Sequence, residues 1–427
     1  MRPRRCRLRY SYLSCISLAF LSASCADEQR EATAQASRQA APAPAFVDSG
    51  RRPNADVATG GTGSLPQAPA PSGARMLSAP RLAVNEHPRP ELIVREVAPS
   101  GSIQLGTLGA QSVPDAIAKA RKVATIGSGG AGDTFGSIAR VAVDDGGYIY
   151  VLDSEFNDVR VLDPSGRTVN RFGYQHDPAT PFRTPTAIAV SANARGALLF
   201  IADRRRQVHV YSRRGDSIAF KVSITLSQTA FDLCALKDRL IVQAGGYNEP
   251  EIIRAYLLDG KAVGAFAPLY NTNDKILRYT FARARIACIR DTTIIVAPES
   301  SIPDVRAYSI SGSPLWVTLL AKFVPVTAFV SAGGGVEVRL PPGGYHRLHS
   351  LSALPGGDVL MQVAYVRPPA VQVGQELAVS TFLLAGRSGR GVSLGDSLPT
   401  IAAVGSQSYV VLRYKPSPTI EIWSSRR

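Results

Sequence analysis

The amino-acid sequence predicts an all-β fold, a six-bladed β-propeller that spans Arg121 to Arg427. Three observations support it: a repeated strand phrase, six matching strand pairs, and an N-terminal strand that fits the incomplete last repeat. A unit that recurs every 45 to 52 residues over most of the span is typical of a propeller or solenoid. Each phrase alternates apolar and polar residues, as a half-buried strand does. Its copies are Val159–Leu162, Val208–Tyr211, Ile253–Tyr256, Val305–Tyr308 and Ile420–Trp423.

The first repeat divides into four short strands. These are Ile138–Val143, Tyr148–Leu152, Val159–Leu162 and Arg167–Phe172. The turns between them contain Asp and Gly, which favour tight chain reversals. Four antiparallel strands joined by short turns make one propeller blade.

Inner strands and second strands each recur six times, which sets the number of blades. The inner strands have a small residue near their middle, as expected where six sheets converge on a narrow axis. They contain Val141–Val143, Ile188–Val190, Leu233–Ala235, Ile286–Cys288, Leu351–Ala353 and Ile401–Ala403. The second strands contain Tyr148–Leu152, Leu198–Ile201, Leu240–Val242, Ile294–Val296, Val359–Met361 and Tyr409–Leu412.

The last blade has only three strands of its own. Lys122–Ile126, ahead of the first blade, matches the fourth strand of that blade. We therefore predict that Lys122–Ile126 pairs with Thr419–Trp423 and closes the ring, which removes exposed sheet edges.

The fifth blade contains an insertion. Its third strand lies 76 residues after that of the fourth blade, counted from Ala307 to Leu383. Val324–Gly344 is predicted to form an extra hairpin and Val366–Leu377 a long loop. Loops carry much of the specificity of rigid scaffolds, so both segments are candidates for a recognition surface. A tolerated surface insertion is the alternative.

The N-terminal residues have the pattern of an export signal. Five arginines in Arg2–Arg9 precede an apolar stretch, Tyr10–Leu21, that is too short to span a membrane. Leu21–Cys25 resembles the lipobox of bacterial lipoproteins, which implies that Cys25 is acylated and becomes the first mature residue. Ordinary signal-peptidase cleavage after Ser24 is the alternative. We expect a signal peptide over 1–24 and an exported lipoprotein of the cell envelope, at the outer membrane or periplasmic face.

Residues 25–90 are predicted to be a disordered tether, because Ala, Pro, Ser, Gly and Gln dominate them. Such a chain averages about 45 Å from end to end. Residues 91–120 are expected to be an N-terminal extension of the propeller. The formal charge is +15, and removal of the five signal-peptide arginines leaves +10. That modest excess indicates no nucleic-acid partner, and we expect a monomer.

Two cysteines, Cys234 and Cys288, lie within the predicted propeller. Export would place them in an oxidising compartment, where a bridge can form. Their positions in successive repeats differ in register by one residue, which on adjacent strands points side chains to opposite faces. We therefore expect two buried free thiols, with a disulfide as the alternative.

The first blade resembles the NHL repeat of six-bladed propellers. In that repeat an Asp ends a strand, and an Asn, an Arg–hydrophobic pair and an Asp-x-x-Gly turn follow. The matching residues are Leu152–Asp153, Asn157, Arg160–Val161, Asp163 and Gly166. Ile201–Asp203 repeats part of the motif, and the later blades keep only the hydrophobic pattern. The resemblance implies an NHL-repeat-like propeller, similar to those of many bacterial lipoproteins and secreted proteins.

The sequence lacks the common catalytic motifs. It contains no His-x-x-Glu-His, Gly-x-Ser-x-Gly, paired Cys-x-x-Cys or phosphate-binding glycine loop. His346 and His349 open the inner strand of the fifth blade, but their spacing of three points them to opposite faces of a regular strand. We predict no catalytic residue, no metal ligand and no cofactor.

A dense polar cluster, Arg204, Arg205 and Arg206, follows the second strand of the second blade. Asp153 and Asn157 lie in the equivalent loop of the first blade, on the same rim of the ring. Arginine binds carboxylate, sulfate or phosphate bidentately. We predict that these five residues bind a ligand, with a solvated loop as the alternative.

Two functional hypotheses follow. The first is a non-catalytic binding module for a protein, peptide or glycan. The alternative is a propeller hydrolase or lyase with an axial metal ion, which needs several Asp, Glu, Asn or His side chains at the axis. The residues expected there are richer in arginine, which favours binding: Ala139, Arg140, Ala187, Asp232, Arg283, Arg285, His346 and His349.

Overall fold

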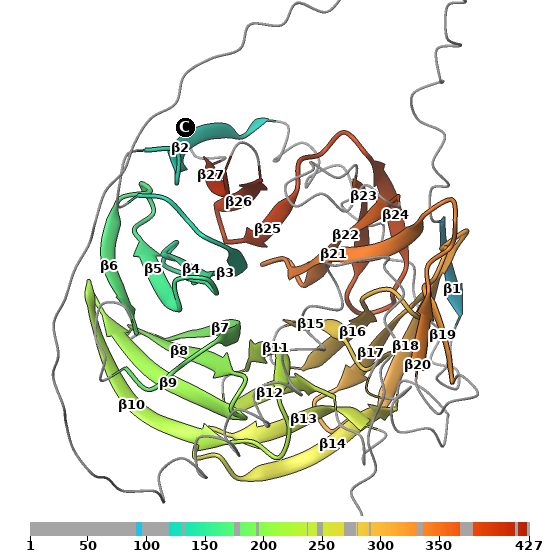
Figure 1. Ribbon diagram of the computed structural model, residues 1–427, viewed down its shortest axis with the longest axis horizontal. Helices are drawn as coiled ribbons and strands as arrows, with labels where there is room; N and C mark the ends of the chain where they lie inside the picture. The colour runs from blue at the N-terminus through green and yellow to red at the C-terminus, as the bar shows by residue number, and fades with distance from the viewer. Residues whose placement is uncertain are drawn as a thin grey trace, which may run out of the picture. The chain divides into compact units, whose positions relative to one another are not determined.

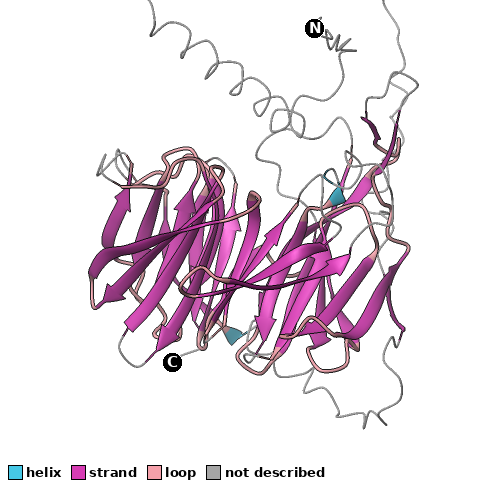
Figure 2. Cartoon of the chain, turned by 90° about the horizontal axis from the view of Figure 1, so that it is seen from below, coloured by secondary structure: helices cyan, strands magenta, loops and turns pink. Residues whose placement is uncertain are grey.

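The computed structural model describes residues 91–95, 119–129, 133–174, 180–193, 196–236, 238–245, 251–268, 279, 281–289, 292–330, 336–367, 379–414 and 417–424. All of them belong to one compact unit, His87–Arg427. The predicted signal peptide, Cys25, the tether and most of the predicted loop Val366–Leu377 lie outside the described residues. The described part is built almost entirely of strands (Figure 2).

Six antiparallel sheets are arranged around a ring, which confirms the predicted six-bladed propeller (Figure 1). Blade one contains β3 (Ile138–Val143), β4 (Ile149–Asp153), β5 (Asp158–Leu162) and β6 (Thr168–Gly173). Blade two contains β7 (Pro185–Asn193), β8 (Gly196–Asp203), β9 (Gln207–Arg214) and β10 (Ser217–Thr225). Blade three contains β11 (Ala230–Ala235), β12 (Arg239–Ala244), β13 (Glu251–Leu257) and β14 (Ala262–Pro268).

The remaining blades follow the same order from the axis outward. Blade four contains β15 (Ala284–Ile289), β16 (Thr293–Pro298), β17 (Asp304–Ser309) and β18 (Pro314–Ala321). Blade five contains β21 (Tyr345–Ala353), β22 (Asp358–Val366), β23 (Val379–Ala385) and β24 (Gly391–Gly395). Blade six contains β25 (Ile401–Val404), β26 (Ser408–Arg413), β27 (Thr419–Ser424) and β2 (Arg121–Ile126).

The N-terminal strand closes the ring as predicted. β2 pairs antiparallel with β27, with Lys122 opposite Trp423 and Ile126 opposite Ile420. The inner strands β3, β7, β11, β15, β21 and β25 contact one another in that order, and β25 contacts β3 again. Both ends of the propeller therefore belong to one blade.

The hydrophobic core is divided among the interfaces between neighbouring blades. A cluster of buried apolar residues fills each interface in turn around the ring. The second strand of a blade is buried on both faces, as in β4, where all five residues are buried. Burial on both sides explains why these strands read as continuous apolar runs rather than as alternating patterns.

The strand order gives the ring two different faces. The connections into each inner strand and the loops between second and third strands lie on one face, the upper face. The turns between first and second strands and between third and fourth strands lie on the lower face. A lower-face turn, Asp163–Gly166, has Gly166 at φ 91°, a conformation that favours glycine.

Two further elements attach to the propeller. β1 (Glu91–Arg95) pairs antiparallel with β18 and gives blade four a fifth strand, so part of the predicted N-terminal extension covers a sheet edge (Figure 1). β19 (Thr327–Val330) and β20 (Val336–Arg339) form the predicted extra hairpin between blades four and five. Within the described residues, no helix has the length and hydrophobicity needed to cross a bilayer.

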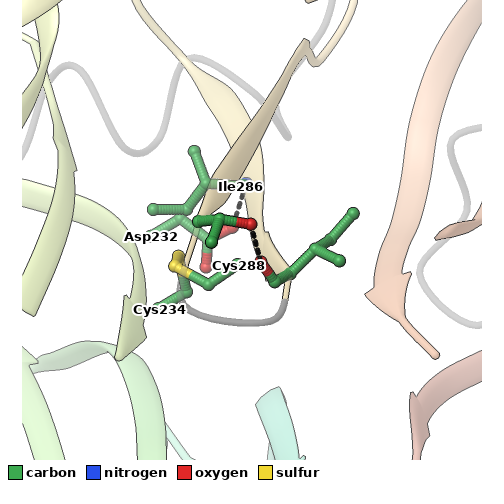
Figure 3. Close-up of a disulfide and its surroundings, with 6 residues drawn as sticks. Asp232, Cys234, Ile286 and Cys288 are labelled. Carbon is green, nitrogen blue, oxygen red and sulfur yellow. Dashed lines mark hydrogen bonds between the residues drawn. A yellow bond between two sulfur atoms is a disulfide. The ribbon is translucent and has the colours of Figure 1, made fainter. Parts of the chain in front are cut away.

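The expectation of two free thiols is wrong, because Cys234 and Cys288 form a disulfide (Figure 3). Their Cα atoms lie 5.7 Å apart. The register argument assumed strands paired in one sheet, where a one-residue shift reverses the side chain. β11 and β15 instead belong to two blades, so their side chains meet across a blade interface and no shared pleat relates them. Nearby, the backbone N–H of Ile286 donates to Asp232 Oδ2 at 3.0 Å (Figure 3).

Candidate functional site

The polar residue in the repeated strand phrase anchors the upper-face connections. Buried Arg160 in β5 donates to the backbone oxygens of Asp133 and Thr134, at 2.9 and 3.0 Å. In β17, Arg306 similarly donates to the backbone oxygen of Pro268 at 2.9 Å. The repeat that identifies the fold is thus also a repeated attachment of the upper-face loops to the blades.

Blade two has a histidine at this position. His209 Nε2 lies 3.1 Å from Asp203 Oδ2 and its Nδ1 lies 2.8 Å from Ser223 Oγ. His209 and Asp203 are fully buried. Burial raises the pKa of Asp203, but hydrogen bonds from His209 and from the N–H of Arg183 outweigh it and hold the pKa below the usual value. Asp203 is therefore a buried carboxylate that fixes the loop after β8.

Asp153 and Asn157, two of the predicted binding residues, shape the equivalent loop of blade one. Asp153 is 1% exposed. It accepts hydrogen bonds from four backbone N–H groups, those of Gly136, Ser137, Glu155 and Phe156. Asn157 has a left-handed backbone, φ 52°, and its Oδ1 accepts from the N–H of Thr184 at 2.9 Å. Both side chains hold the rim in place, and a ligand contact by either stays a prediction.

The predicted arginine cluster lies in the turn between β8 and β9, and its three members are exposed. They have different roles. Arg205 turns back toward its own loop, where its N–H donates to Asp203 Oδ1 at 2.8 Å and its Nε to Asp203 Oδ2 at 3.3 Å. Arg204 and Arg206 contribute main-chain hydrogen bonds to Thr184 and Leu226. Both residues are exposed, as Arg205 is, but Arg205 is the one whose guanidinium pairs with Asp203.

Arg206 occupies a backbone position that arginine does not favour. Its φ is 62°, and it is the residue before β9, as Asn157 is the residue before β5. Asn tolerates the left-handed region because its short polar side chain bonds locally, whereas a long side chain there costs free energy. The loops of blades one and two therefore share a left-handed residue before the third strand. Blade one has Asn157 there, which this conformation favours, whereas blade two has the charged Arg206.

A second polar group, which we call the axial cluster, lies at the upper ends of the inner strands. Its members come from blades one, three, four, five and six: Arg140, Asp232, Arg285, Glu299, Arg347, His349 and Tyr414. In five inner strands the ladder has a β-bulge at this end, and His349 occupies the bulge in β21. A bulge re-aims side chains locally and is frequent beside functional sites.

Arg140 and Asp232 link blades that are not neighbours. Arg140 Nε lies 3.2 Å from Asp232 Oδ1, and a second guanidinium nitrogen donates to the backbone oxygen of Phe231. The pair therefore joins blade one to blade three past blade two, whose inner strand has the small, buried Ala187 at the corresponding place. Burial raises the pKa of Asp232, while Arg140 acts in the opposite direction.

Two other arginines share one carboxylate. Arg285 Nε lies 3.3 Å from Glu299 Oε1, and a terminal nitrogen of Arg347 lies 3.7 Å from Glu299 Oε2. The buried Nε of Arg285 makes no hydrogen bond to a described residue, because its contact with Glu299 is an ion pair without hydrogen-bond alignment. The Arg347 side chain is 47% exposed.

His349 and Tyr414 add neutral groups to the axial cluster. Their rings meet edge to face at 6.3 Å. Burial, with Arg347 and Arg140 nearby, lowers the pKa of His349 to about 4, so this imidazole is neutral at pH 7. Burial likewise raises the pKa of Tyr414, so its phenol keeps its proton. His346 takes no part: its Nδ1 accepts from the N–H of Val324, and its ring stacks on Phe323.

Sequence reasoning placed most of these arginines near the axis without identifying a site. Arg140, Asp232 and Arg285 each stand two residues before the small residue of their inner strands, which is the signal that could have found them. Their pairing across blades is not visible in a linear pattern. Among the described residues, no three His, Cys, Asp or Glu side chains come together as metal ligands would.

Comparison with known proteins identifies no family. No protein-family model and no curated protein matches the chain. Among solved structures, the RRP9 WD40 repeats match at 12% identity and TM-score 0.44, over 71% of this chain and 99% of that chain. BamB from Moraxella catarrhalis matches at 12% identity and TM-score 0.38, over 71% of this chain and 99% of that chain. Virginiamycin B lyase from Staphylococcus aureus matches at 10% identity and TM-score 0.41, over 67% of this chain and 94% of that chain. Similarities this low carry no argument about function.

Proposed function

We propose that this protein is an exported cell-envelope lipoprotein whose propeller is a non-catalytic binding module. Its partner is a protein, peptide or glycan with negative or mixed charge, bound on the upper face. The observation that carries the proposal is the position of Arg204 and Arg206, two exposed arginines on a loop fixed by buried Asp203. Binding residues are commonly held on loops by a rigid scaffold in this way. The NHL-like residues of blade one supply the matching scaffold.

The disulfide supports export independently of the N-terminal sequence. Disulfides persist in oxidising compartments and are rare in the cytosol. The bridge between Cys234 and Cys288 is therefore consistent with a signal peptide over 1–24 and an anchor at Cys25.

Acylation at Cys25 is tested by metabolic labelling. We expect radiolabelled palmitate to enter the full chain and to be absent from the Cys25→Ser variant, because that variant lacks the thiol that forms the thioether. The label is read by immunoprecipitation of each chain from cells grown with the fatty acid. A wild-type protein that starts at Cys25 with a free amine and stays soluble in the periplasm would contradict the anchor and leave only export standing.

The rim is tested with a double substitution, Arg204→Ala with Arg206→Asn. It removes both exposed charges, and Asn suits the left-handed backbone of position 206, so stability should not fall. The probe is a fluorescent glutamate-rich peptide, and fluorescence anisotropy reads its binding. Exposed charge contacts contribute about 0.2–1 kcal/mol each, so we expect the loss of two of them to weaken binding about two- to thirtyfold at low salt. High salt should reduce the difference, because it screens exposed charges.

The matched control is Arg214→Ala, which removes an exposed arginine from the lower-face end of β9. This control should leave peptide binding unchanged. If this single substitution weakens binding, in free energy, by half or more of the effect of the double substitution, the attraction comes from overall charge and the rim assignment fails.

A further inference from the structure

We propose that the axial cluster is a second binding site, separate from Arg204 and Arg206, and that it takes a small carboxylate with Arg347 as its exposed contact. The site is built from different strands and loops than the rim: β3, β11, β15, β21, and the residues after β16 and β26. Its position at the upper ends of the inner strands brings five blades to one place.

Guanidinium donors outnumber carboxylate acceptors around Glu299. A carboxylate and one guanidinium form a matched bidentate pair. Here one carboxylate, Glu299, stands against two guanidinium groups, at 3.3 Å from Arg285 and 3.7 Å from Arg347. The Arg285 Nε is buried without a hydrogen bond to any described residue. Because unmet buried donors are costly, an additional acceptor beside these arginines stabilises the arrangement.

The axial cluster has a formal charge of one positive, because three arginines stand against Asp232 and Glu299, and a singly charged carboxylate balances it. Glu299 remains within the cluster, so any anion that joins it experiences repulsion from that carboxylate. The repulsion is smaller for a singly charged carboxylate than for a phosphate dianion. His349 and Tyr414 are neutral at pH 7 and carry N–H and O–H groups that are able to donate to a carboxylate without adding charge. The residues therefore favour a monoanion.

Side chains of the axial cluster also restrict the size of a ligand. Arg140 reaches from blade one to Asp232 in blade three, so protein side chains occupy the axis at that level. The exposed guanidinium of Arg347 stands at the same end of the inner strands. A carboxylate at the end of a small molecule or of a peptide therefore suits the site better than a bulkier group does.

The test is binding to the mature Cys25→Ser chain, with the imidazole signal of His349 as a local readout by NMR. The probes are acetate, a tripeptide with a free C-terminus, the same tripeptide amidated, and inorganic phosphate, each at constant ionic strength. We expect acetate and the free tripeptide to shift the imidazole signal of His349 at pH 7, where both probes are ionised, because a bound carboxylate offsets Arg347 and Arg140, the cations that face this ring together with Glu299. The amidated tripeptide should have no effect. If only the tripeptide acts, the carboxylate comes from a chain end; if acetate also acts, a free acid suffices.

Variants at position 347 separate charge from geometry. Arg347→Ala should weaken carboxylate binding about tenfold. The affinity of Arg347→Lys should lie between those of Arg347→Ala and the parent chain, because lysine keeps the charge but lacks the planar guanidinium that binds a carboxylate bidentately. Acetate binding should be unchanged in the rim variant Arg204→Ala with Arg206→Asn and in Arg214→Ala. The rim proposal and the axial proposal can therefore fail independently of each other. Equal shifts from the free and the amidated tripeptide, stronger binding of phosphate than of acetate, or full binding by Arg347→Ala would each overturn the proposal.

Discussion

A chain that lacks its first 127 residues will be less stable by about 5 kcal/mol or more than one that lacks only the first 90, because β2 will be missing. β2 contributes buried Ile126 to the core between blades six and one. Burial of one Ile side chain is worth about 1.5–3 kcal/mol. The ladder with β27 adds several hydrogen bonds of about 0.5–1.5 kcal/mol each. Its loss also opens the ring and exposes an edge of β27.

Urea unfolding of three chains, which begin after residues 90, 118 and 127, measures this effect. The chain that begins after 118 lacks β1 and keeps β2, so it is the control for simple shortening. We expect its urea midpoint to be close to that of the chain that begins after residue 90, because β1 only covers the outer edge of blade four. Equal midpoints for the chains that begin after 118 and 127 would show that ring closure adds no stability.

The blades were predictable because their signals are local. Alternation in the third strands, continuous apolar runs in the second strands and turn residues between them follow from burial and backbone geometry alone. β2 was predictable because the last blade has only three strands of its own and the segment that forms β2 matches the fourth strand of blade one. The hairpin of β19 and β20 was also found from alternation around a glycine run.

The features that sequence reasoning missed depend on which strands meet in space. β1 pairs with β18, more than 200 residues away in the sequence, and nothing in its five residues specifies that edge. Arg204, Arg205 and Arg206 look equivalent in the sequence, yet in the structure the Arg205 guanidinium donates to the buried carboxylate of Asp203. Arg140 and Asp232 are 92 residues apart and belong to blades that are not adjacent in the ring. Linear patterns fix the elements, and contacts between elements decide the site.

Loss of the disulfide will have the second large effect. Cys234 and Cys288 close a loop with a sequence separation of 54, for which the chain-entropy estimate is about 4 kcal/mol. The bridge also crosses from blade three to blade four, so it restrains two inner strands that no backbone ladder joins. We expect Cys234→Ala, Cys288→Ala and the double variant to lower the free energy of unfolding by a similar amount, measured by urea unfolding of the mature Cys25→Ser chain.

The comparison among the three variants distinguishes a bridge from two separate thiols. Either single substitution breaks the same bond, so the second substitution should lower the free energy of unfolding little further. If the two side chains acted independently, the losses from the single variants would sum in the double variant. Dithiothreitol should lower the stability of the parent chain to that of the double variant and leave the double variant unchanged. Two reactive thiols in the unreduced, denatured parent chain, together with additive single-variant effects, would contradict the bridge. A bridge confirmed in protein purified from cells would also support export, because the cytosol keeps such thiols reduced.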